Sequence, residues 1–445
     1  MTSPKRWTLK DPDRDLVSLF ARELGLLNPT AQVLANRGVR SLDEARLFVM
    51  PDLAYLHNPF LLPDIFPAVS RIRRAIDRGE KILVYGDRDV DGVTALSVMV
   101  RSLRALGTTP FWYIPSDEGY GLHKPVIDKF AAQGVTLIIT VDCGISAVEE
   151  IDYSSSLGID VIVTDHHEAP VTGIPHAVAV VDPKRADSVY PFKELAGCGV
   201  SFKVAEAVML SFGRWYDRDM VFVFADSQGS LTALKDRNGI PVAELSLKDG
   251  KVSPATLQSF IASSVLIVMQ GSPALSLLET MLGGPAGCQT VPVQESPCQT
   301  VEHLRQLFYG HTRDNDLRMQ FFRDGHLDAV GLGTIADMVP LSGENRILAW
   351  IGMEKIAQSS KPGVRALIEH CQAKAKNGSD VTAKTISWSI TPLLNAAGRR
   401  GKADLAAELM LTDDVYRAHE LMDALEKLNM ERRQLQAENL EKFLP

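Results

Sequence analysis

The chain has 445 residues, of which 45% are hydrophobic and 23% charged, and its formal net charge at pH 7 is −8. This composition fits a globular protein of two or three domains. The acidic balance gives no overall basic field that would mark nucleic acid as a partner, although a local basic groove can lie within an acidic total. No stretch approaches the roughly 20 apolar residues of a membrane helix, so we expect no membrane partner.

The cysteines and the N-terminus bear on the cellular compartment. Five cysteines are an odd number, and none of them shows C-x-x-C spacing. The N-terminus lacks the apolar core of a signal peptide. We therefore expect reduced thiols and a cytoplasmic protein.

The first part of the chain, residues 1–80, is predicted to be a helical region. Ser41 precedes a leucine and two acidic residues, which is the pattern of an N-cap followed by acids in the first helical turn. Prolines punctuate residues 59–67 as a linker, and a further helix is expected around 68–77.

Between residues 81 and 213 the pattern alternates between strands and helices. Near-continuous runs of apolar, β-branched residues are typical of a buried parallel sheet. We therefore predict an α/β fold with a parallel β-sheet flanked by helices. The expected strands are 82–85, 111–114, 136–141, 160–164 and 177–181, and the expected helices are 93–106, 124–132, 146–156 and 200–212.

Residues 214–326 change character and read as an inserted small α+β module. Short strands are expected at 220–224, 231–234 and 241–245, with a hairpin signal between the last two. A helix is expected at 275–282. Residues 283–300 are rich in Gly, Pro, Gln and Ser, which predicts a mobile loop. The opening strand resembles that of a ribonuclease-H-like exonuclease module, but without that module's set of acids.

The α/β pattern resumes over 327–402, with a helix at 345–357. Residues 403–445 are strongly helical, with interleaved charges and no proline before the last residue. This stretch is too long for one ordinary globular helix, so it predicts either two helices or one long connector helix.

Three of the predicted strands stop at acidic or imidazole side chains. The carboxyl ends of parallel strands meet at one edge of a sheet, and open α/β sheets bind ligands there. The residues that follow the three strands are, in chain order, Asp87-x-Asp89-x-Asp91-Gly92, Asp142-Cys143-Gly144 and Asp165-His166-His167.

Carboxylates at this spacing repel one another unless a cation neutralises them, and Mg²⁺ or Mn²⁺ prefers such oxygen ligands. Imidazole favours Mn²⁺ or Zn²⁺ over Mg²⁺. Asp337 is a lone acid in an apolar run, and burying it unpaired would be costly. Each motif alone also fits another interpretation: a solvated Asp-rich turn or a calcium loop for the first, and a helix N-cap for Asp142. Together they predict a two-cation site of the kind that cleaves phosphoesters.

The order of these motifs resembles that of the DHH phosphoesterase superfamily and, within it, the RecJ family of single-strand-specific 5′→3′ DNA exonucleases. The resemblance covers residues 1–213 and 327–445. It implies a DHH catalytic domain in two parts, 81–213 and 327–402, interrupted by the insertion 214–326 and followed by a connector helix region, 403–445. The matching motifs are at 86–95, 118–122, 182–184, 190–203 and 395–399.

The resemblance also implies roles for individual residues. Asp87 and Asp142 would hold one ion, and His167 would face the scissile phosphate, while Asp91 would support the first motif. The second ion would be held by Asp89, Asp142, His166 and Asp337. The residues expected to bind substrate are Lys203, Asn395, Gly398 and Arg399.

The implied activity is hydrolysis of single-stranded DNA to 5′-mononucleotides in repair and recombination, with two Mn²⁺ or Mg²⁺ ions. Single-stranded DNA would be the main partner, with single-strand-binding protein or other repair proteins as further partners. The chain departs from the family at Arg88, where an aromatic residue is usual, after Pro115, and at Leu393, where arginines are usual. It stops within the helix that leads, in the family, to a C-terminal DHH-associated domain, which predicts a fragment or a protein that works without this domain. Two alternatives remain: a catalytically weakened scaffold that binds DNA or a protein, and a DHH phosphoesterase acting on short oligonucleotides.

Overall fold

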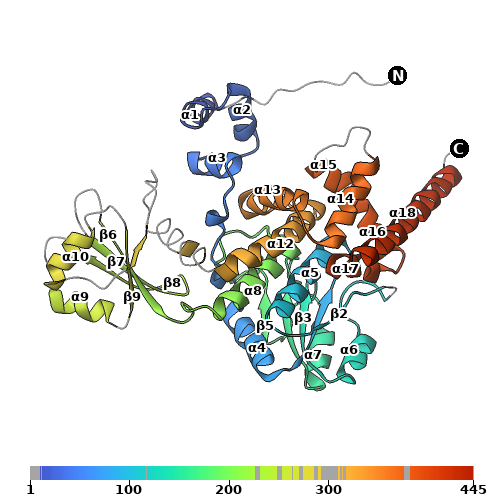
Figure 1. The fold of residues 1–445 in the computed structure, drawn as a ribbon, viewed down its shortest axis with the longest axis horizontal. Helices are drawn as coiled ribbons and strands as arrows, with labels where there is room; N and C mark the ends of the chain where they lie inside the picture. Colours follow the sequence, from blue (N-terminus) through green and yellow to red (C-terminus); the bar gives the residue numbers. More distant parts are fainter. Residues whose placement is uncertain are drawn as a thin grey trace.

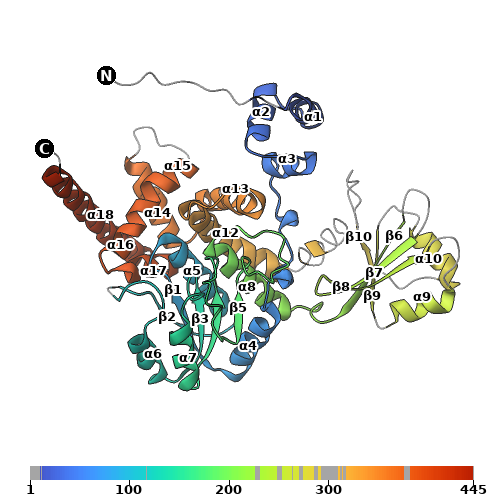
Figure 2. The ribbon, with the colours of Figure 1, turned by 180° about the vertical axis from the view of Figure 1, so that it is seen from behind.

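The computed structural model describes residues 11, 13–116, 118–225, 231–247, 253–262, 264–269, 274–284, 289–291, 309–310, 313, 317–374 and 381–443. Three parts are visible in Figure 1: a small helical arm formed by α1–α3, a large body around a parallel sheet, and a second sheet to one side of the body. The second sheet and helix α18 lie at opposite ends of the longest axis, as the view from behind also shows (Figure 2).

The body is built on a five-stranded sheet in which all strands run parallel. This confirms the predicted α/β fold and all five predicted strands. In spatial order the strands are β2 (Phe111–Tyr113), β1 (Lys81–Gly86), β3 (Val135–Val141), β4 (Asp160–Thr164) and β5 (Ala179–Val181).

Both faces of this sheet are covered by helices, because alternate side chains of each strand point to opposite faces. Ile82 and Val84 of β1 belong to the larger apolar core, whereas Leu83 and Tyr85 belong to a second core on the other face. The larger core is shared with α4 (Ile65–Arg78), α5 (Val90–Ala105) and α8 (Gly197–Ser211), and the second with α6 (Lys124–Ala131) and α7 (Val148–Ser156).

In the described residues of the C-terminal part of the body, all regular elements are helices. Helix α12 packs against α5 and α8 and continues through residue 326 without a break, so we propose that the second part of the body begins near residue 317 rather than at 327. The predicted helical tail consists of two helices, one of the two forms expected. The elements are α12 (Leu317–Ala336), α13 (Gly343–Ala357), α14 (Pro362–Lys374), α15 (Ala383–Thr385), the π-helix η4 (Ile386–Ile390), α16 (Thr391–Arg399), α17 (Ala403–Leu411) and α18 (Val415–Phe443).

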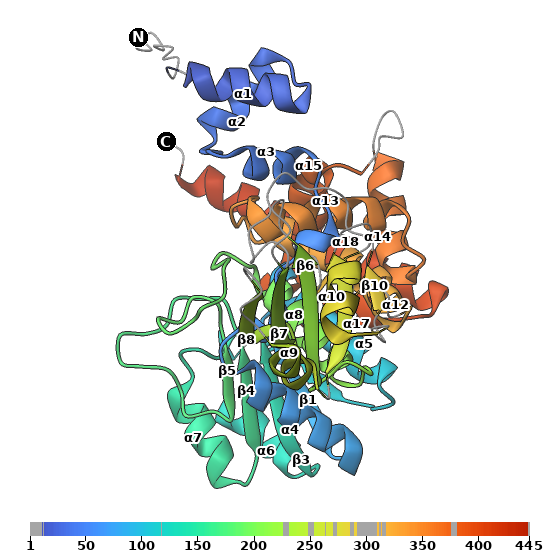
Figure 3. The ribbon, with the colours of Figure 1, turned by 90° about the vertical axis from the view of Figure 1, so that its left-hand side faces the viewer.

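The N-terminal arm packs around its own small core, which includes Phe20, Ala31 and Leu34. Ser41 caps the third helix by accepting a hydrogen bond from the Glu44 amide at 3.2 Å, as predicted. The arm stands beyond α13, on the side away from α6 and α7 (Figures 1 and 3). Its helices are α1 (Arg14–Leu24), α2 (Asn28–Asn36) and α3 (Leu42–Val49), and the linker to α4 holds the short 3₁₀ helices η1 (Leu53–Tyr55) and η2 (Pro59–Leu61).

The second sheet comprises three antiparallel strands followed by two helix-connected strands that run parallel to the first of them. The predicted hairpin turn lies at Asn238–Gly239. In spatial order the strands are β10 (Gln289–Val291), β9 (Val265–Met269), β6 (Asp219–Ala225), β7 (Leu231–Arg237) and β8 (Ile240–Leu247), with helices α9 (Pro254–Ile261) and α10 (Ala274–Leu282).

Three elements of the second sheet differ from the sequence predictions. Helix α9 and strand β9 were not predicted. The predicted mobile loop 283–300 was wrong at β10, which pairs with β9 in parallel; residues 285–288 and 292–300 of that loop lie outside the described residues. Strand β10 could not be predicted because it has only three residues and is stabilised by pairing with β9, which local sequence does not reveal. None of the helices in the described part of the chain has the length and apolarity required to cross a bilayer.

Candidate metal centre

The candidate site lies at the carboxyl edge of the parallel sheet. From β1 the chain crosses to β2 on one side and then returns to β3 on the other, so β1 and β3 flank the point where the strand order reverses. Ligand sites form at such points because adjacent connections leave in opposite directions and open a crevice. Asp87 and Asp89 follow β1, and Asp142 follows β3, so the predicted acids occupy both sides of this crevice.

The structure brings together all five predicted metal ligands in what we call the carboxylate cluster. It consists of Asp87, Asp89, Asp91, Asp142, His166 and Asp337. Three overlapping groups have ligand atoms within 4.8 Å of one another: Asp87 with Asp89 and Asp142, Asp142 with His166 and His167, and Asp91 with His166 and Asp337. Asp142 and His166 each belong to two of these groups, which places them at the centre of the cluster.

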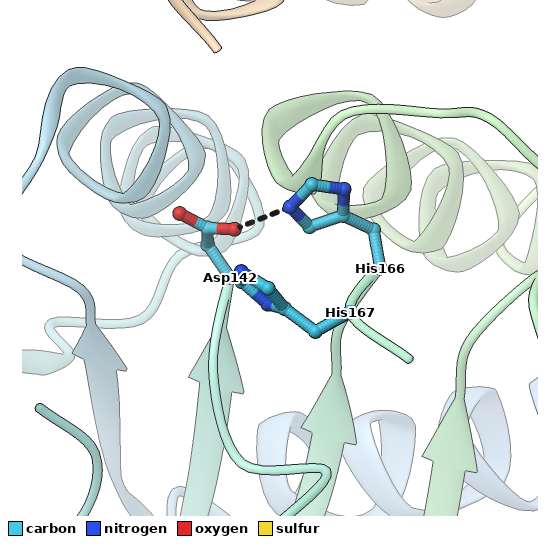
Figure 4. Close-up of side chains that lie close together, drawn as sticks. All are labelled: Asp142, His166 and His167. Carbon is cyan, nitrogen blue, oxygen red and sulfur yellow. Dashed lines mark ion pairs between the residues drawn. The ribbon is translucent and has the colours of Figure 1, made fainter. Parts of the chain in front are cut away.

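Of the three contacts between His166 and carboxylates of the cluster, the one with Asp142 is the shortest. Nε2 of His166 lies 3.1 Å from Oδ1 of Asp142, and Figure 4 shows this carboxylate and the imidazoles of His166 and His167 gathered above the strand ends. Asp142 has φ of 60°, a left-handed conformation that costs energy for any residue except glycine and that often marks a functional site. A Cβ at Gly197 would lie 2.2 Å from Oδ1 of Asp142, so only glycine lets α8 begin this close to the carboxylate.

Asp91 connects the cluster to the start of α8. Its two carboxylate oxygens accept hydrogen bonds from the amides of Gly197 at 2.6 Å and Cys198 at 3.0 Å. Its Oδ2 also lies 3.9 Å from Nε2 of His166. The expected supporting role of Asp91 therefore has a geometric basis, since this side chain fixes α8 against the first motif.

The two histidines have different surroundings. His166 is buried, and desolvation lowers its pKa to about 4, which keeps the imidazole neutral and able to ligate a cation. His167 is exposed, and its Nδ1 lies 2.7 Å from Oδ1 of Asp165. This hydrogen bond raises the pKa of His167, so its protonated form is favoured. The pair therefore offers one metal ligand and one cationic group that faces solvent.

Asp165 is the residue that orients this pair. Burial alone would raise its pKa, but the hydrogen bond from His167 and those from the backbone of Ile145 and His166 hold the pKa below the usual range. Its carboxylate accepts the amides of Ile145 at 2.9 Å, His166 at 2.8 Å and His167 at 3.2 Å. Asp165 is thus a buried anion whose bonds fix the turn after β4.

The carboxylates of the cluster have the opposite electrostatics. Burial, together with the charge of Asp89, raises the pKa of Asp87 to about 6. Burial first, and then neighbouring carboxylates, also raise the pKa values of Asp91, Asp142 and Asp337. Like charges gathered in a buried place disfavour ionisation unless a cation compensates them.

Unsatisfied atoms test whether a divalent cation fits. Within the described residues, Oδ1 of Asp87, Oδ2 of Asp337 and Nδ1 of His166 are buried without a hydrogen-bond partner, and the 3.1 Å contact of Oδ1 of Asp142 with Nε2 of His166 does not have hydrogen-bond geometry. Such atoms are rare in folded proteins because each costs desolvation energy. Three of the four are carboxylate oxygens, the ligands that Mg²⁺ and Mn²⁺ prefer. The donor set therefore fits hard divalent ions.

The residues expected to bind substrate lie in different places. Arg399 is exposed at the end of α16 and remains available. Asn395 lies on the same helix, and its Oδ1 accepts a hydrogen bond from the Val90 amide at 3.1 Å, so its side chain supports the first motif. A Cβ at Gly398 would lie 2.5 Å from the Arg88 carbonyl oxygen, which makes this glycine a packing position against the same motif. In this structure Asn395 and Gly398 contact the loop after β1, and their expected substrate contacts stay predictions.

Lys203 was wrongly predicted to bind substrate. It is fully buried in the middle of α8, where Nζ lies 2.8 Å from Glu344 and donates to the His57 carbonyl oxygen at 2.6 Å. A lysine on an apolar helix can be an exposed cation or half of a buried ion pair, and only the position of Glu344, far along the chain, distinguishes the two.

Tyr120, Asp165 and Lys184 lie at the site but were not among the predicted site residues. The Tyr120 hydroxyl is 3.4 Å from Nδ1 of His167. The positive charge of Lys184 lowers the pKa values of His166 and Asp337. The matching motifs at 118–122 and 182–184 contain Tyr120 and Lys184, so these motifs were the signals that could have identified them.

Comparisons with known proteins agree with this geometry. Residues 81–221 match the family model described as the DHH family, N-terminal domain. The chain thus carries a DHH domain, and the match spans the whole parallel sheet and the cluster residues that follow β1, β3 and β4.

The relatives specify the branch of the superfamily. The chain is 30% identical over 440 residues to the single-stranded-DNA-specific exonuclease RecJ of Bacillus subtilis (strain 168). This alignment covers 98% of this chain and 41% of the relative. It is 30% identical over 411 residues to RecJ of Escherichia coli (strain K12), covering 91% of this chain and 53% of the relative. The chain is similar to RecJ over most of its own length, as the motifs predict, and it spans about half the length of the curated relatives it matches.

Solved structures show the same fold. RecJ from Thermus thermophilus in complex with Mn²⁺ superposes with a TM-score of 0.62 at 25% identity, over 98% of this chain and 47% of that one. An exonuclease RecJ bound to manganese gives a TM-score of 0.56 at 27% identity, over 88% of this chain and 71% of that one.

Proposed function

We propose that this chain is the nuclease core of a metal-dependent exonuclease that hydrolyses single-stranded DNA from the 5′ end to 5′-mononucleotides. The observation that carries the proposal is the carboxylate cluster, in which buried, partnerless carboxylate oxygens from the strand ends and the end of α12 converge around His166. The RecJ relatives, named as single-stranded-DNA-specific exonucleases, supply the substrate class.

The ligand set proposed for the metal is Asp87, Asp89, Asp142, His166 and Asp337, with Asp142 shared between two Mn²⁺ or Mg²⁺ ions. The structures of RecJ bound to manganese support this choice of ion. When bound, two such ions supply an activated water nucleophile and neutralise charge that builds on the phosphoryl oxygens.

The protein's own groups would position the substrate around the ions. His167, held by Asp165 in a form that favours protonation, faces solvent and would donate a hydrogen bond to an oxygen of the scissile phosphate. The Tyr120 hydroxyl stands beside His167 and would help to orient the same phosphate. Arg399, exposed at the end of α16, would contact the DNA backbone.

Two features favour the alternative of a weakened scaffold that binds DNA or a protein partner. Arg88 places a cation between the metal ligands Asp87 and Asp89, and Leu393 is buried in the core, where it offers no group to a phosphate. The complete set of predicted ligands argues for catalysis, because a scaffold has no need to retain buried, unpaired carboxylates.

The direct test uses 5′-radiolabelled single-stranded DNA incubated with the protein and Mn²⁺. We expect labelled mononucleotide from the earliest times and much slower hydrolysis of the same strand in a duplex. Asp142→Ala and His166→Ala should abolish the release. The chain offers a matched control pair, because Asp152 and His176 also face each other, at 3.8 Å, but on the surface; Asp152→Ala and His176→Ala should retain full activity.

Three results would contradict the proposal in different ways. Intact label after long incubation with folded protein would favour the scaffold. Activity confined to di- and trinucleotides would favour a short-oligonucleotide phosphoesterase. Label appearing only in long fragments would reverse the polarity. Two further proposals are single-strand-binding protein as a partner and a cytoplasmic location, which fits the free thiols of Cys143 and Cys198.

A further inference from the structure

A cavity of about 390 Å³ lies between the N-terminal arm and the body, outside the carboxylate cluster. Its walls come from the α2–α3 region of the arm, from the loop before α8 and from the start of α13. They include Arg37, Phe48, Phe192, Gly343 and Arg346. We call this cavity the arm cleft.

Two guanidinium groups approach the same aromatic ring in the arm cleft. The guanidinium carbon of Arg346 lies 4.6 Å from the centre of the Phe48 ring and 4.7 Å from that of Trp350. The guanidinium carbon of Arg37 lies 5.9 Å from the centre of the same Phe48 ring. Burial, and then the charge of Arg37, lower the pKa of Arg346, so the two cations repel each other.

Among the residues that the structure describes, no carboxylate neutralises either cation. Across the described residues, no Asp or Glu oxygen lies within 4 Å of the Arg37 or Arg346 guanidinium; Nε of Arg346 donates only to the Phe48 carbonyl oxygen, at 3.1 Å. Glu44 also lines the cleft, but its Oε2 accepts the Arg40 amide at 2.8 Å. Two unneutralised cations beside aromatic faces suit a phosphate chain with stacked bases.

The arm cleft is joined to the carboxylate cluster by two short segments of chain. Ser342, in its wall, is five residues after Asp337, so the two lie at most about 17 Å apart along the backbone. Phe192, in the opposite wall, is three residues before Leu195, whose backbone contacts His166. The Asn345 side chain donates to the carbonyl oxygens of Glu194 and Pro340 and so ties the two segments together. The cleft is therefore held at a fixed position relative to the cluster.

We propose that the arm cleft is a second contact for single-stranded DNA, which binds phosphates and bases of the strand that extends beyond the nucleotide held at the carboxylate cluster. This inference rests on the proposed function. It assigns a role to the N-terminal arm: the arm lengthens the binding site by a few nucleotides through Arg37 and Phe48, while Arg346 and Phe192 provide the opposite wall. It also explains how a protein of net charge −8 would hold a polyanion, since the required charge is local.

The test compares binding of two 3′-fluorescein-labelled, 5′-phosphorylated probes, a thymidine dinucleotide and (dT)20, by fluorescence anisotropy in EDTA, where no hydrolysis occurs. Arg37→Ala is the informative variant because this side chain is exposed and makes no structural hydrogen bond in the described part of the chain. We expect Arg37→Ala to weaken (dT)20 binding about tenfold, the usual value of a charged hydrogen bond. Binding of the dinucleotide should change less than about twofold.

A matched control and a salt titration sharpen the test. Arg22 is an exposed arginine on the same arm but outside the cleft, so Arg22→Ala should leave both affinities unchanged. Each lost phosphate contact lowers the slope of log affinity against log salt by about 0.7 for single strands, and Arg37→Ala should show this loss for (dT)20. Arg37→Lys keeps the charge and should restore part of the affinity.

The outcomes separate the cleft from the proposed function. Equal (dT)20 affinity for Arg37→Ala and Arg22→Ala, with tight binding by the wild type, would overturn the arm cleft alone. Equal weakening of both probes by Arg37→Ala would also overturn it. A cleft that binds only the nucleotides beyond the carboxylate cluster should not affect binding of the dinucleotide. Failure of the wild type to bind either probe would overturn the proposed function and this inference with it.

Discussion

Two buried charged clusters in this molecule have opposite designs. In the lysine cluster, defined as Lys203, Glu206, Arg313 and Glu344, anions face cations: Lys203 lies 2.8 Å from Glu344 and 3.7 Å from Glu206, and Arg313 lies 3.8 Å from Glu206. Burial alone would raise the pKa of Glu344, but Lys203 holds it below its usual value. In the carboxylate cluster, five acids surround one neutral imidazole.

A structural charge can be distinguished from a functional one by whether the fold itself compensates it. A buried ion pair is compensated within the fold, and removal of one partner leaves the other uncompensated. The carboxylate cluster is not compensated within the described part of the fold, and its acids have raised pKa values. A bound ligand, such as a divalent cation, would therefore have to compensate the charge of the carboxylate cluster. The predictions below test this contrast from both sides.

The largest effect is expected from Asp142→Asn. This change removes the proposed shared ligand, so activity should fall by more than about 100-fold, since even outer-shell changes at metal sites cost 10–100-fold. It also removes a repelling charge, so the metal-free variant should unfold at the same or a higher temperature than the metal-free wild type. Thermal melts in EDTA beside nuclease assays measure both. A clearly lower melting temperature of the metal-free variant would show that Asp142 stabilises the fold. The carboxylate cluster would then not differ from the lysine cluster in this respect.

Lys203→Met should have the reverse effect. Removing one partner of a buried ion pair costs about 3–5 kcal/mol of unfolding free energy, so denaturant unfolding should show a large loss. Activity per folded molecule should stay at the wild-type level at a temperature where the variant remains folded, because Lys203 does not reach the carboxylate cluster. A selective loss of DNA binding in the folded variant would support the predicted contact between Lys203 and the substrate.

Stability should depend on pH differently with and without metal. The pKa of Asp87 is raised to about 6 in the folded protein, whereas Asp titrates near 3.9 in unfolded chains. The folded state therefore binds more protons between these values, and the free energy of unfolding of metal-free protein should fall as pH rises through this window. His166, with its pKa lowered to about 4, contributes in the opposite sense below pH ~6.5.

Mn²⁺ should replace those protons, so its stabilising effect should be larger at pH 8 than at pH 5. At 100 times the dissociation constant, a bound ion contributes about 2.7 kcal/mol. Melting temperatures in EDTA and in Mn²⁺ at the two pH values measure the effect. An equal Mn²⁺ shift at both values would show that the carboxylates of the cluster are not the ligands.

The smallest effect is expected from Arg88→Tyr. The half-buried guanidinium lies in the sequence between two ligands, and its charge lowers the pKa of Asp87 while opposing the arrival of a cation. Its removal should lower the Mn²⁺ concentration for half-maximal activity by about two- to fivefold, the range of a partly solvated charge interaction. Arg104→Tyr, at the far exposed end of α5, is the matched control. An unchanged or higher Mn²⁺ requirement would assign Arg88 to substrate binding.

The parallel sheet and the chemistry at its edge could be predicted from the sequence alone. β-Branched runs separated by helical stretches have one stable arrangement, a sheet covered on both faces, and this arrangement brings strand ends to one edge. For this reason Asp87, Asp89, Asp142 and His166 could be placed together without coordinates. Asp337 could be added because an isolated acid in an apolar run needs a partner if it is buried.

Long-range packing determines which polar residues support the fold and which are exposed to solvent. Lys203 and Arg399 are both cations on helices next to family motifs, yet one is buried against Glu344 and the other is exposed. The role of Asp165, the contacts of Asn395 and Gly398 with the loop after β1, strand β10 and the arm cleft all depend on neighbours distant in the chain. Local patterns fix which residues a strand or helix buries, but the compensation of a charge depends on long-range packing, which local patterns do not encode.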